Sequence, residues 1–131
     1  MKKILSAGFA FFCMSAAATA VTYECRMTQI DRSNWVPEIV YIEYDPNTGG
    51  VVVQDPISNH FTGGPVRGAV DTDNAKRMTF KWDVQTTNKA AQFTTMKYRA
   101  TIMKATKKAS VTGKPLGYLN TYRSAGACVE K

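Results

Sequence analysis

The stretch Arg77-Met78-Thr79-Phe80-Lys81-Trp82-Asp83-Val84 alternates polar or charged residues with large apolar ones. A period of two residues is typical of a β-strand that buries one of its faces. The segment 94–104 repeats this pattern, and its apolar positions are Met96, Tyr98, Ala100 and Ile102. The two segments, joined by the polar residues 86–92, therefore predict a long antiparallel hairpin.

The same alternation continues over most of the chain. Beyond the hairpin we expect strands at 21–28, 36–45, 51–53, 66–71, around Val111 and at 116–122. Turn-forming residues separate them, most clearly the run Asp45-Pro46-Asn47-Thr48-Gly49-Gly50. Residues 55–65 are expected to form a loop, and Gly113-Lys114-Pro115 to break a strand. The sequence predicts an all-β fold of about eight antiparallel strands in a small barrel or a sandwich.

The first 20 residues have the features of a secretory signal peptide. A Lys-Lys pair precedes an apolar stretch over 4–14, and Ala18-Thr19-Ala20 is a small-x-small cleavage site. The apolar stretch is shorter than a membrane span, and no second one follows. We therefore expect a signal peptide over 1–20, a single β-domain over 21–131, and at most peripheral membrane contact. The short basic start and alanine-rich end favour a periplasmic or secreted bacterial protein.

Two cysteines, Cys25 and Cys128, remain after this leader. Exported proteins meet oxidising conditions, in which cysteines pair. Cys25 is in phase with the apolar face of the first strand, so we expect a structural disulfide between the first strand and the C-terminal segment. Closing a loop of about 100 residues stabilises by roughly 4–5 kcal/mol in the chain-entropy account. Joined ends favour the barrel, because closure removes the edges of the sheet.

Charge is distributed unevenly along the domain. Residues 21–75 carry a net charge of −5, whereas residues 76–108 carry +8. The predicted hairpin gathers basic residues on its outward face and at one end, and these form a candidate anion-binding site: Arg77, Lys81, Lys97, Arg99, Lys104, Lys107 and Lys108. Like charges on neighbouring strands repel, which favours compensation by a lipid headgroup, an anionic glycan or an acidic protein. Alternatively, the face is merely solvated, and the acidic first half neutralises it.

Nucleic acid is not an expected partner. The outward face of the hairpin lacks the interleaved aromatic residues on which bases stack, and export makes such a partner less accessible.

Five aromatic residues offer another kind of site, the mouth of a barrel around a small ligand: Trp35, Tyr41, Phe61, Tyr118 and Tyr122. The bulky residues between 78 and 98 favour a filled interior over a cavity.

Candidate catalytic and metal-binding residues are few. His60 is the only histidine, and it lies in a loop-like segment without a recognisable nucleophile motif. One histidine and no Cys-x-x-Cys pair predict no zinc or haem site. Asp71-x-Asp73-Asn74 matches only the start of a calcium loop, because Trp82 stands where the last ligand should be. We expect a protein that is not an enzyme and has no cofactor; a small hydrolase using His60 is the least favoured alternative.

The opening Tyr23-Glu24-Cys25 and the terminal Cys128 resemble the C-type lysozyme inhibitors of the bacterial envelope. The resemblance implies a small exported β-barrel that blocks lysozyme with a loop. The family's Ser-Gly-x-x-Tyr type of loop is not found here, and residues 58–61 depart from it at most positions, so no inhibitory residue is carried over. Lysozymes are strongly basic and would be repelled by a basic domain.

The sequence thus leads to two functional hypotheses. The first is an exported, non-enzymatic β-domain that binds an anionic envelope component or an acidic protein through the basic hairpin. The alternative is a protein-inhibitor module of the lysozyme-inhibitor type.

Overall fold

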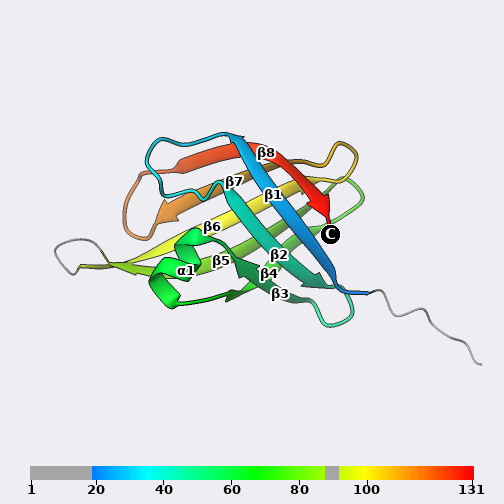
Figure 1. Cartoon of the computed structure of the whole chain (residues 1–131), viewed down its shortest axis with the longest axis horizontal. Helices are drawn as coiled ribbons and strands as arrows, with labels where there is room; N and C mark the ends of the chain where they lie inside the picture. Colours follow the sequence, from blue (N-terminus) through cyan, green and yellow to red (C-terminus); the bar gives the residue numbers. More distant parts are fainter. Residues whose placement is uncertain (1–18, 88–91) are drawn as a thin grey trace, which may run out of the picture.

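The chain forms a closed barrel of eight antiparallel strands in sequence order, each hydrogen-bonded to the next and the last to the first (Figure 1). This computed structural model describes residues 19–87 and 92–131. The strands are β1 (Val21–Gln29), β2 (Ile39–Asp45), β3 (Gly50–Gln54), β4 (Val66–Asp73), β5 (Arg77–Thr87), β6 (Phe93–Met103), β7 (Lys108–Pro115) and β8 (Tyr122–Glu130). The all-β prediction of about eight antiparallel strands is confirmed, with the barrel as its form. The predicted signal peptide lies almost entirely outside the described residues.

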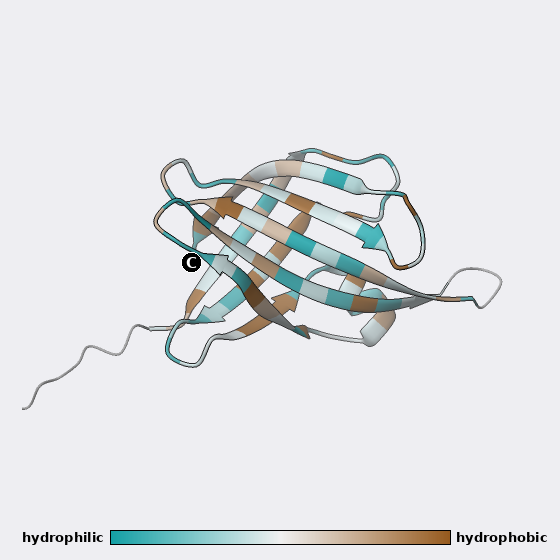
Figure 2. Cartoon of the chain, turned by 180° about the vertical axis from the view of Figure 1, so that it is seen from behind, coloured by the Kyte–Doolittle hydropathy of each residue, from teal (hydrophilic) through white to brown (hydrophobic). Residues whose placement is uncertain are grey.

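Hydrophobic and hydrophilic residues alternate along the strands (Figure 2). The buried positions of this alternation form an apolar core inside the barrel. The inward positions predicted for β5 and β6 are all buried. Their register sets large residues against small or flat ones, since Phe80 faces Ala100 and Trp82 stacks on Tyr98 with 5.6 Å between ring centroids. Burying one such side chain stabilises by about 1.5–3 kcal/mol. The core is therefore built from the pattern that first predicts the hairpin.

The predicted disulfide closes the barrel. Cys25 of β1 and Cys128 of β8 are direct cross-strand partners, with 4.0 Å between their Cα atoms. Both residues are 1% exposed, so the bond belongs to the core. A disulfide of this kind is compatible with an oxidising extracellular compartment. Among the described residues, no helix is long and apolar enough to cross a membrane.

The last strand differs from its prediction. Residues 116–121 form an irregular connection that begins with a turn at 116–117, and β8 begins only at Tyr122. The inward positions of β8 include Ser124 and Gly126, which carry no apolar signal, so its period of two is hidden in the sequence. Gly126 is required, because a Cβ atom there would collide with the backbone of β1.

Strand β7 also departs from its prediction, because it continues through Gly113 to Pro115 instead of breaking there. A Cβ atom on Gly113 would lie 2.8 Å from the ring of Tyr98. The glycine therefore makes room for a core side chain and does not mark a turn.

A seven-residue helix, α1 (Pro56–Thr62), occupies the segment predicted as a loop. Asp55 caps it: its Oδ1 accepts a hydrogen bond from the Ser58 amide at 2.9 Å, and Ser58 Oγ accepts one from the Asp55 amide at 3.1 Å. Pro56 occupies the first turn, and Gly63 ends the helix with a φ of 76°. These caps are the available sequence signal, because two turns are too short for a visible helical period. The helix packs against β5 and β3 at one end of the barrel.

Candidate functional site

The predicted basic hairpin forms as expected, since β5 and β6 pair in antiparallel register across 11 residues. Lys81 lies directly opposite Arg99, and both reach the same carboxylate: Asp71 is 3.8 Å from Lys81 Nζ and 3.1 Å from Arg99 Nη1. Lys97 pairs with Asp83, its cross-strand partner, at 3.6 Å. The face of the hairpin is therefore partly neutralised by acidic residues of the same chain.

The basic residues at the end of the hairpin have carboxylate partners too. Lys104 Nζ is 2.6 Å from Asp73 Oδ1, and Lys107 Nζ is 3.7 Å from Glu130 Oε1. Surface pairs of this kind contribute at most about 1 kcal/mol each. Of the seven predicted residues, Arg77 and Lys108 form no ion pair within the described part of the chain.

The aspartates of the partial calcium motif thus serve the hairpin. Asp71 and Asp73 form ion pairs with basic side chains, Arg99 and Lys104 respectively. Asn74 Oδ1 accepts hydrogen bonds from the amides of Lys76 and Arg77 at 2.9 and 3.0 Å. In the described ranges, 19–87 and 92–131, no three His, Cys, Asp or Glu side chains come together so as to hold a metal ion. His60 lies on α1 with its ring edge-on to Phe61, and Ser58 is taken up in the cap of the same helix.

A broad hollow, which we call the basic trough, lies on the outside of the barrel over β6, β7, β8 and β1. Its volume is about 960 Å³. Small and hydroxyl-bearing residues form its floor, among them Thr101, Ser110, Ala125, Gly126 and Ala127. Three cations line it: Arg26 of β1, Lys108 of β7 and Arg123 of β8. Met103 and Val129, both partly exposed, add apolar surface to the walls.

Strand register explains how the trough is built. Ala127 is the cross-strand partner of both Lys108 and Arg26, so these cations stand two strands, or about 10 Å, apart with a methyl group between them. The next outward row contains Ala125, Ser110, Thr101 and Thr79. The row beyond it contains Arg123, Thr112, Arg99 and Lys81. A floor of small and hydroxyl residues therefore lies between two cationic rows about 13 Å apart along the strands.

The cations of the trough are unequally paired. Arg26 Nη2 is 3.3 Å from Glu24 Oε1, but Glu24 also holds Lys131 at 3.2 Å and accepts a hydrogen bond from Tyr41 at 3.1 Å. The pKa of Glu24 is lowered chiefly by the hydrogen bond from Lys131, and burial opposes this shift. The hydrogen bond from Tyr41 and the positive charges of Lys131 and Arg26 lower the pKa further. That carboxylate is thus shared among several partners and does not neutralise Arg26 by itself.

Lys108 and Arg123 have no ion-pair partner among the described residues. The carboxylate of Asp31 contacts the backbone of Arg123, because its Oδ2 accepts a hydrogen bond from the Arg123 amide at 3.3 Å. The guanidinium and the ammonium group are therefore available to an outside anion.

Two residues of the trough, Arg26 and Arg123, were not among the sequence-predicted sites. They lie about 100 positions apart in the chain and meet the hairpin only because the barrel closes β8 onto β1. Arg26 carries a sequence signal, since it alternates out of phase with Cys25. Of the seven basic residues predicted on the hairpin, Lys108 lines the trough, whereas the other six do not: Arg77, Lys81, Lys97, Arg99, Lys104 and Lys107.

The molecule is a small closed β-barrel with a disulfide across its seam and a basic trough beside that seam. Comparison with known proteins adds no further assignment: no protein-family model, no curated protein and no solved structure matches the chain. Its function must therefore be argued from its own residues.

Proposed function

We propose that this protein is an exported, non-enzymatic binding protein that takes an anionic glycan of the cell envelope into the basic trough. The observation that carries the proposal is the pair of cationic rows on either side of a floor of small and hydroxyl residues. The earlier hypothesis of a basic hairpin is kept in part: Lys108 lines the trough, and Arg99 and Lys81 continue one row.

An anion is favoured because the trough concentrates cations without matching carboxylates. Three cations and one carboxylate line it, and that carboxylate, Glu24, is already engaged with Lys131. Like charges held near one another cost stability, and an incoming anion relieves that cost. Arginine contributes a planar fork that grips a carboxylate, sulfate or phosphate with two hydrogen bonds.

The form of the trough favours a slender sugar chain over a membrane surface or a folded acidic protein. Lys108, Arg26 and Arg123 line a hollow, whereas a flat bilayer calls for cations that project from the surface. Ala125 and Ala127 let a ring approach the sheet closely, and Ser110 and Thr101 offer hydroxyl groups as donors and acceptors. A polyhydroxylated anion can use both features at once.

The proposal is tested by charge reversal with a matched control. The double variant Lys108→Glu/Arg123→Glu changes two cations of the trough, whereas Lys76→Glu/Lys114→Glu changes two exposed cations outside it by the same net charge. Calorimetric titration with heparin and polygalacturonate oligosaccharides, at 50 and 200 mM NaCl, measures affinity. We expect the trough variant to bind at least about tenfold more weakly, since a charged hydrogen bond contributes about 1.5–3 kcal/mol. The control should lose less than about threefold.

Other outcomes would contradict the proposal. Equal losses in the two double variants would mean that only net charge attracts the glycan. Binding that ignores salt would exclude an electrostatic site. Binding to anionic phospholipid vesicles without binding to either glycan would transfer the function to the membrane surface. Inhibition of lysozyme by the wild-type protein would favour the inhibitor alternative, which charge repulsion between two basic proteins disfavours.

A further inference from the structure

A second pocket opens at one end of the barrel, where α1 and the connections β1–β2 and β7–β8 lie beside the ends of β5 and β6 that carry Thr86 and Thr94. We call it the mouth pocket. Its volume is about 200 Å³. Its lining combines aromatic, apolar and a few polar residues: Trp35, Thr86, Thr94, Met96, Pro115, Tyr118, Asn120 and Tyr122. None of these lines the basic trough, so the two sites are separate.

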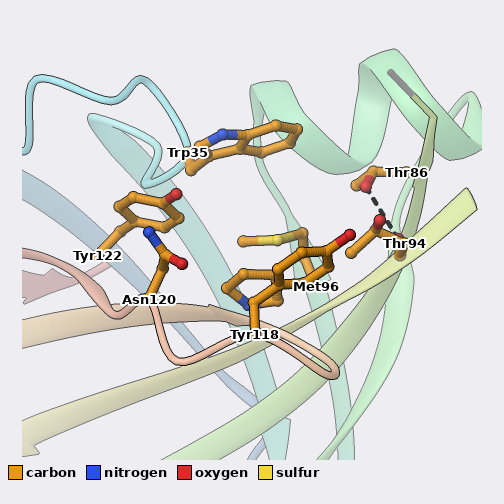
Figure 3. Close-up of a pocket in the computed structure, with 8 residues that line it drawn as sticks. Trp35, Thr86, Thr94, Met96, Tyr118, Asn120 and Tyr122 are labelled. Atoms are coloured by element: carbon orange, nitrogen blue, oxygen red, sulfur yellow. Dashed lines mark hydrogen bonds between the residues drawn. The ribbon is translucent and has the colours of Figure 1, made fainter. Parts of the chain in front are cut away.

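The pocket has one fixed wall and one exposed wall (Figure 3). Trp35 forms the fixed wall: it stacks on Phe61 of α1 with 6.1 Å between ring centroids, and its carbonyl accepts a 2.7 Å hydrogen bond from Tyr98 Oη. Tyr118 stands across the pocket on the β7–β8 connection and is 58% exposed. Met96 lies between them at the floor. The arrangement leaves a slot between two aromatic rings.

The chemistry of the lining selects a flat and mostly apolar group. Met96 and Pro115 offer no strong hydrogen-bonding side-chain group, and the Thr86 hydroxyl is already engaged with the Thr94 carbonyl at 2.9 Å. A monosaccharide would bury several hydroxyl groups against this floor without partners, which is costly. The amide of Asn120 and the hydroxyl of Tyr122 lie together on one side of the slot, where a single polar substituent can bond.

We propose that the mouth pocket binds one aromatic or similarly flat apolar ring that carries a single polar group, held between Trp35 and Tyr118. The size fits, because an apolar cavity of about 150 Å³ holds benzene, and 200 Å³ adds room for a short substituent. Offset or edge contacts with aromatic walls and with the Met96 sulfur would stabilise such a ring.

The ring has two sources, a small molecule or the aromatic side chain of a bound polypeptide. Exposed apolar residues surround the same end of the barrel, with Leu119 98% exposed and Phe93 79% exposed. These residues would be covered by a polypeptide but not by a small ring. The probes are therefore 4-ethylphenol, which is a ring with a short tail, and N-acetyltyrosinamide, which adds peptide groups to the same ring.

Two tryptophans make the test direct. Trp35 lines the pocket, whereas Trp82 is buried in the core against Tyr98. Each indole N–H gives one signal in a ¹⁵N correlation spectrum of the labelled protein, and Trp35→Phe assigns them. We expect 4-ethylphenol to shift the Trp35 signal in a saturable way and to leave the Trp82 signal in place. Methyl glucoside should shift neither signal.

Neighbouring substitutions supply the control. Tyr118→Ala removes the exposed wall and should weaken binding about five- to tenfold, whereas Tyr118→Phe keeps the ring and should retain the affinity. Leu119→Ala, next along the chain but outside the lining, should change the affinity less than twofold. Tyr118 and Leu119 are both exposed on the β7–β8 connection, so we expect their variants to fold like the wild-type protein.

Several results would overturn the inference: no shift of Trp35 with either ring probe at millimolar concentration, equal losses in Tyr118→Ala and Leu119→Ala, or stronger binding of methyl glucoside than of 4-ethylphenol. Binding of N-acetyltyrosinamide alone would support a ring supplied by a polypeptide. The trough variant Lys108→Glu/Arg123→Glu should leave all these shifts unchanged, so failure at the mouth and failure at the trough are distinguishable.

Discussion

Removal of the Cys25–Cys128 bond tests how much of the stability resides in the closure of the barrel. The bond joins residues 103 positions apart. In the chain-entropy account, a loop of about 100 residues is worth about 4.7 kcal/mol at 25 °C. Single domains have free energies of unfolding of about 5–15 kcal/mol. The double variant Cys25→Ala/Cys128→Ala should therefore lose a large part of its stability, and slightly more because both side chains are buried.

Urea unfolding, followed by tryptophan fluorescence to which the buried Trp82 contributes, measures this loss. With a slope of about 1–3 kcal/mol per molar urea, the midpoint should fall by roughly 1.5–5 M. Reduced wild-type protein is the matched control, because it lacks the bond but keeps both sulfur atoms. The reasoning is refuted if both forms lose less than about 1 kcal/mol. If only the alanine variant is destabilised, then packing and not the cross-link is responsible.

Two further predictions concern backbone and burial. Burial raises the pKa of Asp55, although hydrogen bonds from the amides of Ser58 and Ile57 partly oppose this, and its Oδ2 has no hydrogen-bond partner in the described structure. Because the pKa of Asp55 is raised in the folded protein, the stability that this residue contributes is lost as pH rises from about 4 through that pKa. Asp55→Asn keeps the capping oxygen and should therefore melt at a higher temperature than wild type at pH 7. A difference in melting temperature that fails to close toward pH 4 would contradict this. Gly126→Ala should lower the free energy of unfolding by about 1–3 kcal/mol or more, because the new Cβ atom would collide with the Arg26 carbonyl. Gly64→Ala, where a Cβ meets nothing within 4 Å, should stay within about 0.5 kcal/mol in the same thermal melts.

The fold was predictable wherever burial imposes a period of two. Residues 77–84 and 94–104 alternate without interruption, and the structure buries the faces that this alternation predicts. Prediction failed where a core position demands a small residue: Gly113 makes room for the Tyr98 ring, and Gly126 admits the backbone of β1. In both cases the glycine is set by close packing, and the sequence alone does not distinguish this from a turn.

The candidate sites were predictable only in part. The register of β5 and β6 brings the basic hairpin together as expected, but its acidic partners come from β4, β5 and β8. The trough depends on β8 lying beside β1, a contact that no local pattern contains. Trp35, Tyr118 and Tyr122 were named as candidates for a barrel mouth, and they do line one pocket. Phe61 supports that pocket from behind, and Tyr41 instead lies on the outer face beside Glu24.

The position of the disulfide also determines how the protein responds to mechanical force. Strands β2 to β7 lie entirely within the covalent loop between Cys25 and Cys128. Tension applied to the two ends of the chain is borne by the sulfur–sulfur bond and does not reach the hydrogen bonds of those strands. An unfolding machine that pulls on one end meets a closed covalent loop after Cys25 or Cys128, and must either pass two strands of chain at once or wait for a reductant. The barrel is thus protected against processive unfolding from its ends, independently of its thermodynamic stability.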